Sequence, residues 1–252
     1  MSQEKDDSNH KQLKVAIMDS GINKSHPDLN IQEENSVNFV ELEKKVIDDF
    51  GHGTAIAGII AAQNNDFGIQ GIAPNVEIFD LKVLDEKGKG SIDDFIKAVE
   101  WCITNEIDVI NVSFGFQTEN ERLKEVIKRA LDYSIIIVAA AGNTYGLGVE
   151  YPAKYEGVIS VNSINQDLKL LNSSASGKID FVAPGFEVLS TDKAGGYSTF
   201  TGTSFAAAYI TGAISKLLQE NSFNKNLGEN IVIDLGENDY DSSYGYGFLK
   251  IK

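Results

Sequence analysis

The chain has 252 residues, of which 42 % are hydrophobic, and this suits one large α/β domain with a full core. Its formal net charge of −15 argues against nucleic acid or an anionic membrane as a partner and suits a protein that attracts basic substrates. The single cysteine, Cys102, rules out an intrachain disulfide. No apolar run is long enough to span a membrane.

Residues 1–12 are predicted to form a flexible N-terminal segment, followed by one domain over residues 13–252. The first ten residues are polar and lack the hydrophobic stretch of a signal peptide. We therefore expect a cytoplasmic protein, or a secreted one whose signal and pro-segment have been removed.

The first predicted element is a buried strand at residues 13–18, which ends in a turn at Asp19. An acid at the carboxyl end of a central parallel strand lies where α/β sheets bind ligands. Taken alone, Asp19 is more often a turn residue than a catalytic one.

A histidine framed by glycines, His52, opens a predicted helix of small apolar residues. His10 lies in the N-terminal segment and His26 in a loop, so His52 is the histidine that close-packed backbone surrounds. The acidic pair Asp48 and Asp49 precedes it, and we expect this pair to favour positive charge in a bound substrate.

The middle of the chain alternates between strands and helices. Strands are expected at residues 77–84, 108–114, 135–141, 158–164 and 181–183, and helices at 91–105 and 121–133. The strand interiors are continuously apolar, which is typical of a parallel sheet covered on both faces. The predicted fold class is therefore α/β.

Ser204 stands at the start of the last predicted helix, between Gly202-Thr203 and a run of small residues. Gly202 permits a tight turn, and Thr203 is a suitable N-cap. A helix N-terminus has unpaired N–H groups and partial positive charge, so a serine there can attack a carbonyl while its own N–H binds the oxyanion. Considered alone, such a serine is more often only a cap.

Asp19, His52 and Ser204 together supply the acid, base and nucleophile of a catalytic triad. Asn143 follows a buried strand and adds a side-chain amide that can donate a hydrogen bond. With these residues the chain resembles the subtilisin-like serine peptidases over residues 13–250. The matching motifs are D-S-G-I, H-G-T and G-T-S around the three triad residues, with N-V-S-F-G at 111–115, A-A-G-N at 140–143 and Y-P-A at 151–153.

The resemblance implies the three-layer subtilisin-like fold, a central, mostly parallel twisted sheet with helices on both faces. It also implies a serine endopeptidase that works through an acyl-enzyme. Ser204 would be the nucleophile and His52 the general base, Asp19 would orient His52, and Asn143 with the Ser204 N–H would form the oxyanion hole. The implied substrate-binding residues are Ser113, Phe114 and Gly115 along the S1 pocket, and Gly88 and Gly90 in an edge that pairs with the substrate backbone.

Ala208 and Tyr209 depart from the family pattern, which usually has proline and histidine at these positions. Proline fixes φ in the first turn of a helix. We expect its loss to let Ser204 shift slightly, without abolishing function.

Glu150 precedes the Y-P-A segment, and aligning on that segment puts it at the floor of the S1 pocket. A carboxylate there predicts a preference for Lys or Arg, or for Gln, just before the cleaved bond. It also disfavours large apolar groups. The alternative is that Glu150 turns outward to solvent, because residues 144–149 form a Gly-rich loop.

The resemblance also implies a structural calcium ion held by Asp28 and Asn65, with loop carbonyls completing the shell. The alternative is a turn held by Asn and Gly alone. Asp66 is expected to be solvated, and no organic cofactor is expected.

We thus expect a monomeric processing endopeptidase that acts on a peptide or protein, and removal of leader peptides from lantibiotic precursors is one specific hypothesis. The alternatives are a general intracellular degradative subtilisin and a non-catalytic peptide-binding protein on the same fold. A dinucleotide-binding protein is disfavoured because no G-x-G-x-x-G follows the first strand.

Overall fold

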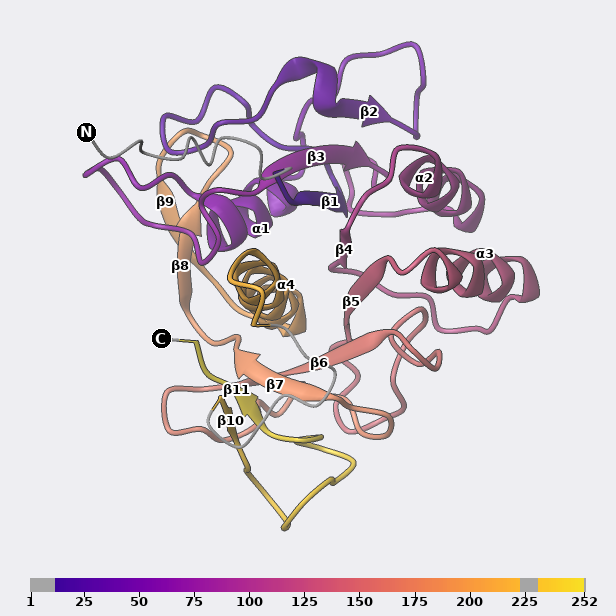
Figure 1. Cartoon of the computed structure of the whole chain (residues 1–252), viewed down its shortest axis with the longest axis vertical. Helices are drawn as coiled ribbons and strands as arrows, with labels where there is room; N and C mark the ends of the chain where they lie inside the picture. The colour runs from indigo at the N-terminus through magenta and orange to yellow at the C-terminus, as the bar shows by residue number, and fades with distance from the viewer. Residues whose placement is uncertain (1–11, 223–230, 252) are drawn as a thin grey trace, which may run out of the picture.

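A computed structural model describes residues 12–222 and 231–251, and the predicted flexible segment lies outside these residues except for Gln12. A nine-stranded sheet runs through the centre in the order β10-β11-β7-β6-β5-β4-β1-β3-β2 (Figure 1). Every pair in it is parallel except β10 with β11. The strands of this sheet are β1 (Lys14–Asp19), β2 (Ser36–Asn38), β3 (Glu77–Lys82), β4 (Val109–Val112), β5 (Ile136–Ala140), β6 (Ile159–Ile164), β7 (Phe181–Pro184), β10 (Val232–Ile233) and β11 (Phe248–Leu249).

Helices cover both faces of the sheet, and the predicted three-layer α/β fold is confirmed. Helices α1 and α4 pack together on one face, and α2 and α3 on the other (Figure 1). Their bounds are α1 (His52–Ala61), α2 (Ile92–Thr104), α3 (Glu121–Asp132) and α4 (Thr203–Gln219), with a short 3-10 helix, η1 (Glu33–Asn35).

Strand β1 shows why the strands have apolar residues at successive positions of their sequences. Val15 and Ile17 join the core under α1 and α4, whereas Ala16 and Met18 join the core under α2 and α3. Alternate residues point to opposite faces of a strand, so a sheet buried on both sides needs apolar residues at every position.

The carboxyl end of β1 is the point where the strand order reverses. The chain continues from β1 to β2 and β3 on one side, and then crosses to β4, β5, β6 and β7 on the other. Open α/β sheets bind ligands at such a switch point. Asp19 is the last residue of β1 and therefore lies at this position.

The structure differs from the predicted elements in a few places. The antiparallel hairpin of β8 (Val188–Thr191) and β9 (Tyr197–Phe200) was not predicted. The second strand, β9, shows little alternation between buried and exposed residues, because Ser198 and Thr199 are both exposed. Thr203 is not the N-cap of α4 but its first helical residue, and Gly202 is the N-cap, with a φ of 148°.

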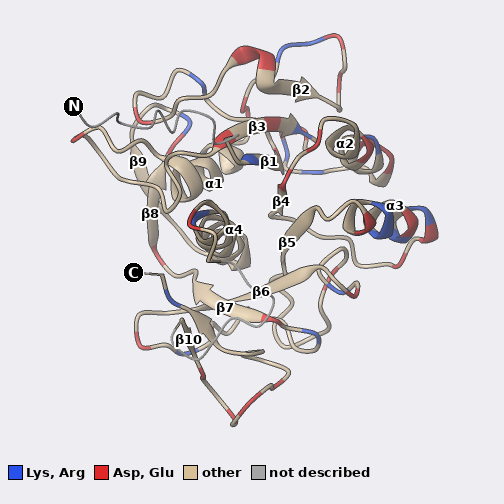
Figure 2. Ribbon diagram, viewed as in Figure 1, with Lys and Arg blue, Asp and Glu red and all other residues tan. Residues whose placement is uncertain are grey.

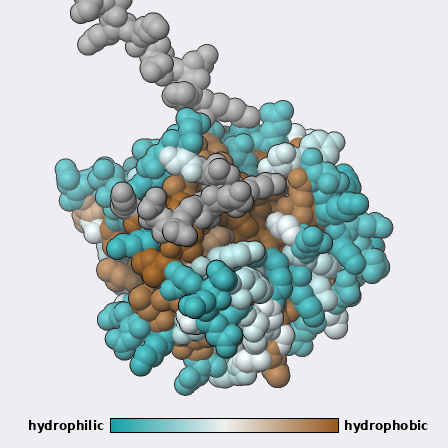
Figure 3. Space-filling model, turned by 60° about the horizontal axis from the view of Figure 1, so that its bottom comes forward, coloured by the Kyte–Doolittle hydropathy of each residue, from teal (hydrophilic) through white to brown (hydrophobic). Residues whose placement is uncertain are grey.

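The surface is rich in charge, as the composition requires. Charged residues gather on α2, α3 and the edge loops, whereas α1 and α4 are nearly free of charge (Figure 2). On the face shown in Figure 3, hydrophilic side chains predominate at the rim and apolar ones surface between them. Among the described residues, no helix is long and apolar enough to cross a membrane.

Candidate active site

Asp19 and His52 form a close pair at the carboxyl edge of the sheet. Nδ1 of His52 lies 2.9 Å from both carboxylate oxygens of Asp19. Asp19 is 1 % exposed and also accepts a hydrogen bond of 2.7 Å from the N–H of Ser20. A carboxylate on Nδ1 makes this nitrogen the protonated one and leaves Nε2 as the base.

Gly53 allows the first turn of α1 to reach the end of β1. A Cβ atom at this position would lie 2.2 Å from the carbonyl oxygen of Gly21 and 3.1 Å from Cβ of Asp19. Any side chain would therefore push the helix away from Asp19. This contact explains why glycine follows the histidine.

The pKa of His52 is raised above its ordinary value of 6.5 by its acidic neighbours. Burial on its own lowers this pKa, but the charge and hydrogen bond of Asp19, together with the charge of Asp48, outweigh burial. The rings of Phe205 and Phe50 lie 5.4 and 6.2 Å from the imidazole. These rings limit the access of water to the pair.

Ser204 is the second residue of α4 and is 9 % exposed. Its hydroxyl donates to the carbonyl of Ser113 at 2.7 Å, and no hydrogen bond joins it to His52 among the described residues. Ser113 lies just after β4 and donates from its own hydroxyl to the Ser204 carbonyl at 3.2 Å. The Ser204 side chain is thus held against the end of β4 rather than against the His52 imidazole.

The two family departures lie behind Ser204 on the same helix. Ala208 is fully buried, and the ring of Tyr209 lies 5.8 Å from that of Phe248 in β11. The pair therefore packs α4 against the sheet and the C-terminal strand.

Asn143 lies across from Ser204, after β5. Its Oδ1 accepts from the N–H of Thr203 at 3.2 Å and from the Thr203 hydroxyl at 3.4 Å. This contact fixes the amide orientation, so Nδ2 is the free donor. The N–H of Ser204 has no acceptor among the described residues. Two unpaired donors, the Nδ2 group and the Ser204 N–H, therefore stand at the helix N-terminus.

The predicted S1 segments lie side by side. Phe116 and Tyr151 exchange backbone hydrogen bonds of 2.7 and 2.9 Å, and Glu150 N–H donates to the carbonyl of Ala141 at 3.0 Å. These bonds bring the segment from Ser113 to Phe116, the end of β5 and the Y-P-A segment into one wall.

The side chain of Glu150 lies between two glycines and is half-buried, and its role in substrate binding stays a prediction. A Cβ atom at Gly115 would lie 2.7 Å from Glu150 Oε2, and one at Gly142 would lie 2.8 Å from the same oxygen. Burial raises the pKa of this carboxyl. Among the described residues, no Lys or Arg forms an ion pair with it.

The predicted extended edge lies beside this wall. A Cβ atom at Gly90 would lie 3.7 Å from the ring of Phe114, and one at Gly88 would lie 2.8 Å from the ring of Phe50. The ring of Phe50 therefore lies between the loop that precedes His52 and the predicted edge at Gly88, and it is 45 % exposed. Sequence reasoning missed Phe50, because only its packing on Gly88 reveals its place.

The expectation for the acidic pair before His52 needs a correction. Asp48 is 7 % exposed and its carboxylate is taken up by internal hydrogen bonds, so it does not face a substrate. The side chain of Asp49 is 53 % exposed. When two aspartates follow one another in a loop, the sequence gives no signal that tells which of them turns inward.

The two predicted calcium ligands have different surroundings. Asp28 is fully buried, and its Oδ2 accepts from Ile69 N–H at 2.9 Å and from the Tyr197 hydroxyl at 3.0 Å, while Oδ1 has no partner. Asn65 is exposed, and its Oδ1 accepts from the N–H of Phe67 at 3.1 Å. The described residues contain no cluster of three His, Cys, Asp or Glu side chains that would hold a metal.

Several known proteins have sequences similar to that of this chain. Residues 10–247 match the model of the subtilase family. Subtilisin E of Bacillus subtilis is 38 % identical over 95 % of this chain, which spans 65 % of that protein. A subtilisin of Bacillus pumilus is 38 % identical over 95 % of this chain and 90 % of its own length. The minor extracellular protease Epr of Bacillus subtilis is 35 % identical over 96 % of this chain and 38 % of its own length. The chain belongs to the subtilase family of serine peptidases.

Proposed function

We propose that this chain is a serine endopeptidase that cleaves through an acyl-enzyme. The observation that carries the proposal is the Asp19–His52 pair at 2.9 Å, whose imidazole lies 5.4 Å from the ring of Phe205. Phe205 follows Ser204 at the glycine-capped N-terminus of α4. Nε2 of His52 removes the hydroxyl proton as Ser204 attacks the carbonyl, and then passes that proton to the leaving amine. The Ser204 N–H and Asn143 Nδ2 donate to the oxyanion that forms.

The resting orientation of Ser204 bears on the non-catalytic alternative. Its hydroxyl is bonded to the Ser113 carbonyl at 2.7 Å. Rotation about one side-chain bond moves the oxygen between staggered positions, so this orientation does not prevent approach to His52. A protein that only binds peptides would keep the serine unreactive, and covalent labelling separates the two functions.

Glu150 supports a preference for Lys or Arg before the cleaved bond. Its carboxylate stands between Gly115 and Gly142 without an ion-pair partner, and burial has already raised its pKa. A cationic side chain in the pocket pairs with this charge, whereas an apolar one leaves it unpaired and desolvated. Gln is the second choice because its amide donates to the carboxylate.

The test is kcat/KM for matched peptides with Arg, Gln, Leu or Glu before the cleaved bond. We expect the order Arg, Gln, Leu, Glu, and in Glu150→Gln a fall in the Arg to Leu ratio of about 10–100-fold, as for loss of a charge-assisted pair. Glu156→Gln, at an exposed glutamate nearby, is the matched control. Equal rates for Arg and Glu peptides in the wild type would contradict the role of Glu150.

A preference of this kind for the residue before the cleaved bond supports a processing role rather than general degradation. A charged S1 floor restricts cleavage to few sites in a folded or precursor protein, whereas a degradative peptidase gains from a permissive pocket. Removal of leader peptides from lantibiotic precursors is the specific role we propose. Mapping all cleavage sites in a mixed peptide library tests it, since cuts after many residue types would favour degradation.

We also propose that Asp28 holds a structural calcium ion with Asn65 and loop carbonyls. The buried, unpartnered Oδ1 of Asp28 fits a hard cation, and Asn65 Oδ1 retains a second lone pair. A ligand of the native state stabilises by about 2.7 kcal/mol at a hundredfold excess over its Kd. We expect calcium to raise the Tm of the wild type and of the control Asp66→Asn, but not of Asp28→Asn. Identical melting curves with calcium and with chelator would exclude the site.

A further inference from the structure

Asp48 lies in the loop between β2 and α1 and accepts four hydrogen bonds. Its Oδ1 accepts from the Ser20 hydroxyl at 2.7 Å and from the Gly51 N–H at 2.6 Å. Its Oδ2 accepts from the N–H and the hydroxyl of Thr54 at 3.0 and 2.5 Å. A carboxylate can accept all four of these hydrogen bonds, since each oxygen offers two lone pairs.

The donors to Asp48 flank the catalytic pair on both sides. Ser20 follows Asp19 directly, while Gly51 and Thr54 bracket His52. The Ser20 hydroxyl also accepts from the N–H of Gly53 at 3.0 Å. The end of β1 and the first turn of α1 are therefore joined by a second set of bonds, parallel to the Asp19–His52 contact.

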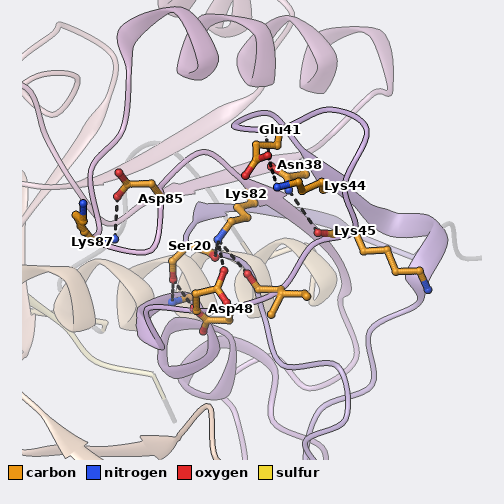
Figure 4. A network of polar contacts seen from close by, with 12 residues as sticks. Ser20, Asn38, Glu41, Lys44, Lys45, Asp48, Lys82, Asp85 and Lys87 are labelled. Carbon is orange, nitrogen blue, oxygen red and sulfur yellow. Dashed lines mark hydrogen bonds and ion pairs between the residues drawn. The ribbon is translucent and has the colours of Figure 1, made fainter.

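Lys82 supports the same arrangement from the end of β3. Its ammonium group donates to the carbonyls of Ser20 and Ile47 at 2.6 and 2.9 Å, and the residue is 5 % exposed. Figure 4 shows Ser20, Asp48 and Lys82 pointing toward one another. The loop that carries Asp48 is thus fixed to β1 from two directions.

We propose that Asp48 is a positioning residue that holds Asp19 and His52 in register through Ser20 and the first turn of α1. The proposal rests on the peptidase activity proposed above. A carboxylate is required because all four of its contacts are donors. An asparagine would direct its own NH₂ group at two of those donors.

The charge of Asp48 has a second, measurable effect on His52. The acidic groups that act on the imidazole are Asp19 and Asp48, and both raise its pKa against the effect of burial. Asp80, on β3, faces Asp48, and Lys82 offsets part of this negative charge. Since neutral His52 is the active form, kcat/KM rises with pH through this pKa. Removing the Asp48 charge therefore moves the acid limb to lower pH.

The experiment compares Asp48→Asn with Asp49→Asn, a neighbour that loses the same charge at a side chain that is 53 % exposed and lies 3.9 Å from the Lys82 ammonium group. We expect Asp48→Asn to lower kcat about 100-fold with KM nearly unchanged, as for a misplaced catalytic group. It should also shift the acid limb to lower pH, and Asp49→Asn should do neither to a comparable degree. A folded Asp48→Asn protein that matches Asp49→Asn in kcat and in pH profile would overturn the proposal.

Two further measurements keep the proposal testable. Ser20→Ala removes the hydrogen bond to Asp48 and the one from the Gly53 N–H without changing any charge. We expect kcat to fall about tenfold with the pH profile retained. If Asp48→Asn does not fold, an unchanged kcat in Ser20→Ala overturns the proposal. NMR titration of His52 in the wild type and Asp48→Asn needs no turnover. A lowered pKa supports the proposal even if the wild type cleaves no peptide, in which case only the proposed function fails.

Discussion

The two faces of the sheet carry helices that begin in different ways. On the face covered by α2 and α3, both helices have N-cap residues whose side chains accept a backbone hydrogen bond. Ser91 accepts from Asp94 N–H and Asn120 from Leu123 N–H, both at 3.1 Å. On the active-site face, α1 and α4 have glycine N-caps with no side-chain hydrogen bond.

This difference determines which acceptors the backbone N–H groups at the N-termini of the helices bind. The N–H of Thr54 in α1 donates to Asp48, 6 residues earlier in the chain, and that of Thr203 in α4 donates to Asn143, 60 residues earlier. The N–H of Ser204 has no acceptor among the described residues. A local cap satisfies a donor for the sake of stability. A helix without a local cap can keep a backbone N–H group at its N-terminus, here that of Ser204, available for chemistry.

The largest expected effect comes from the two serines at helix starts. Ser204→Ala should abolish turnover, with a loss of about 10⁴–10⁶-fold in kcat, because triad members act as a unit. Ser91→Ala makes the same chemical change at α2 and should cost about 1 kcal/mol of stability with kcat unchanged. The check is steady-state kinetics with labelling by a fluorophosphonate. A wild type that stays unlabelled would favour the peptide-binding alternative.

The two asparagines give the next comparison. Asn143→Ala should lower kcat by about 10²–10³-fold with little change in KM, as for loss of one oxyanion donor. Asn120→Ala should lower the free energy of unfolding by about 1 kcal/mol and leave kcat intact. Kinetics and urea unfolding of both variants decide the matter. If Asn120→Ala slowed turnover as much as Asn143→Ala, the division between the two faces would not hold.

The smallest effect concerns stability on the active-site face. Asp80 shares the α1 and α4 side of β3 with Ile78, and burial raises its pKa to about 7 despite the Lys24 ammonium at 3.1 Å. Between pH 4 and 7 the folded state therefore holds a proton that the unfolded state has lost, so stability falls as pH rises.

Asp80→Asn removes this dependence because an amide does not titrate. We expect a Tm above that of the wild type at pH 8, by about 2–4 °C for each kcal/mol regained, and a much smaller difference at pH 4. Thermal unfolding at both pH values is the measurement. An equal difference at pH 4 and pH 8 would show that Asp80 does not titrate in this range.

The sequence by itself determined the fold class and the three catalytic candidates. Continuous apolar strands require a sheet buried on both faces, and the glycines beside His52 and Ser204 mark places where backbone must approach closely. Local chemistry of this kind is visible in a linear motif. The caps Ser91 and Asn120 are also local features, because their partners lie three residues away.

Only the tertiary structure decided which side chains turn inward. Asp48 and Asp49 are chemically identical neighbours, yet the carboxylate of the first accepts hydrogen bonds from Ser20 and Thr54, whereas that of the second is 53 % exposed and lies 3.9 Å from the Lys82 ammonium group. Likewise, the inward orientation of Glu150 depends on Gly115 and Gly142, which come from other strands' ends. Such choices rest on partners distant in the chain, and the free energy of burying a carboxylate depends on those partners and not on its sequence neighbours.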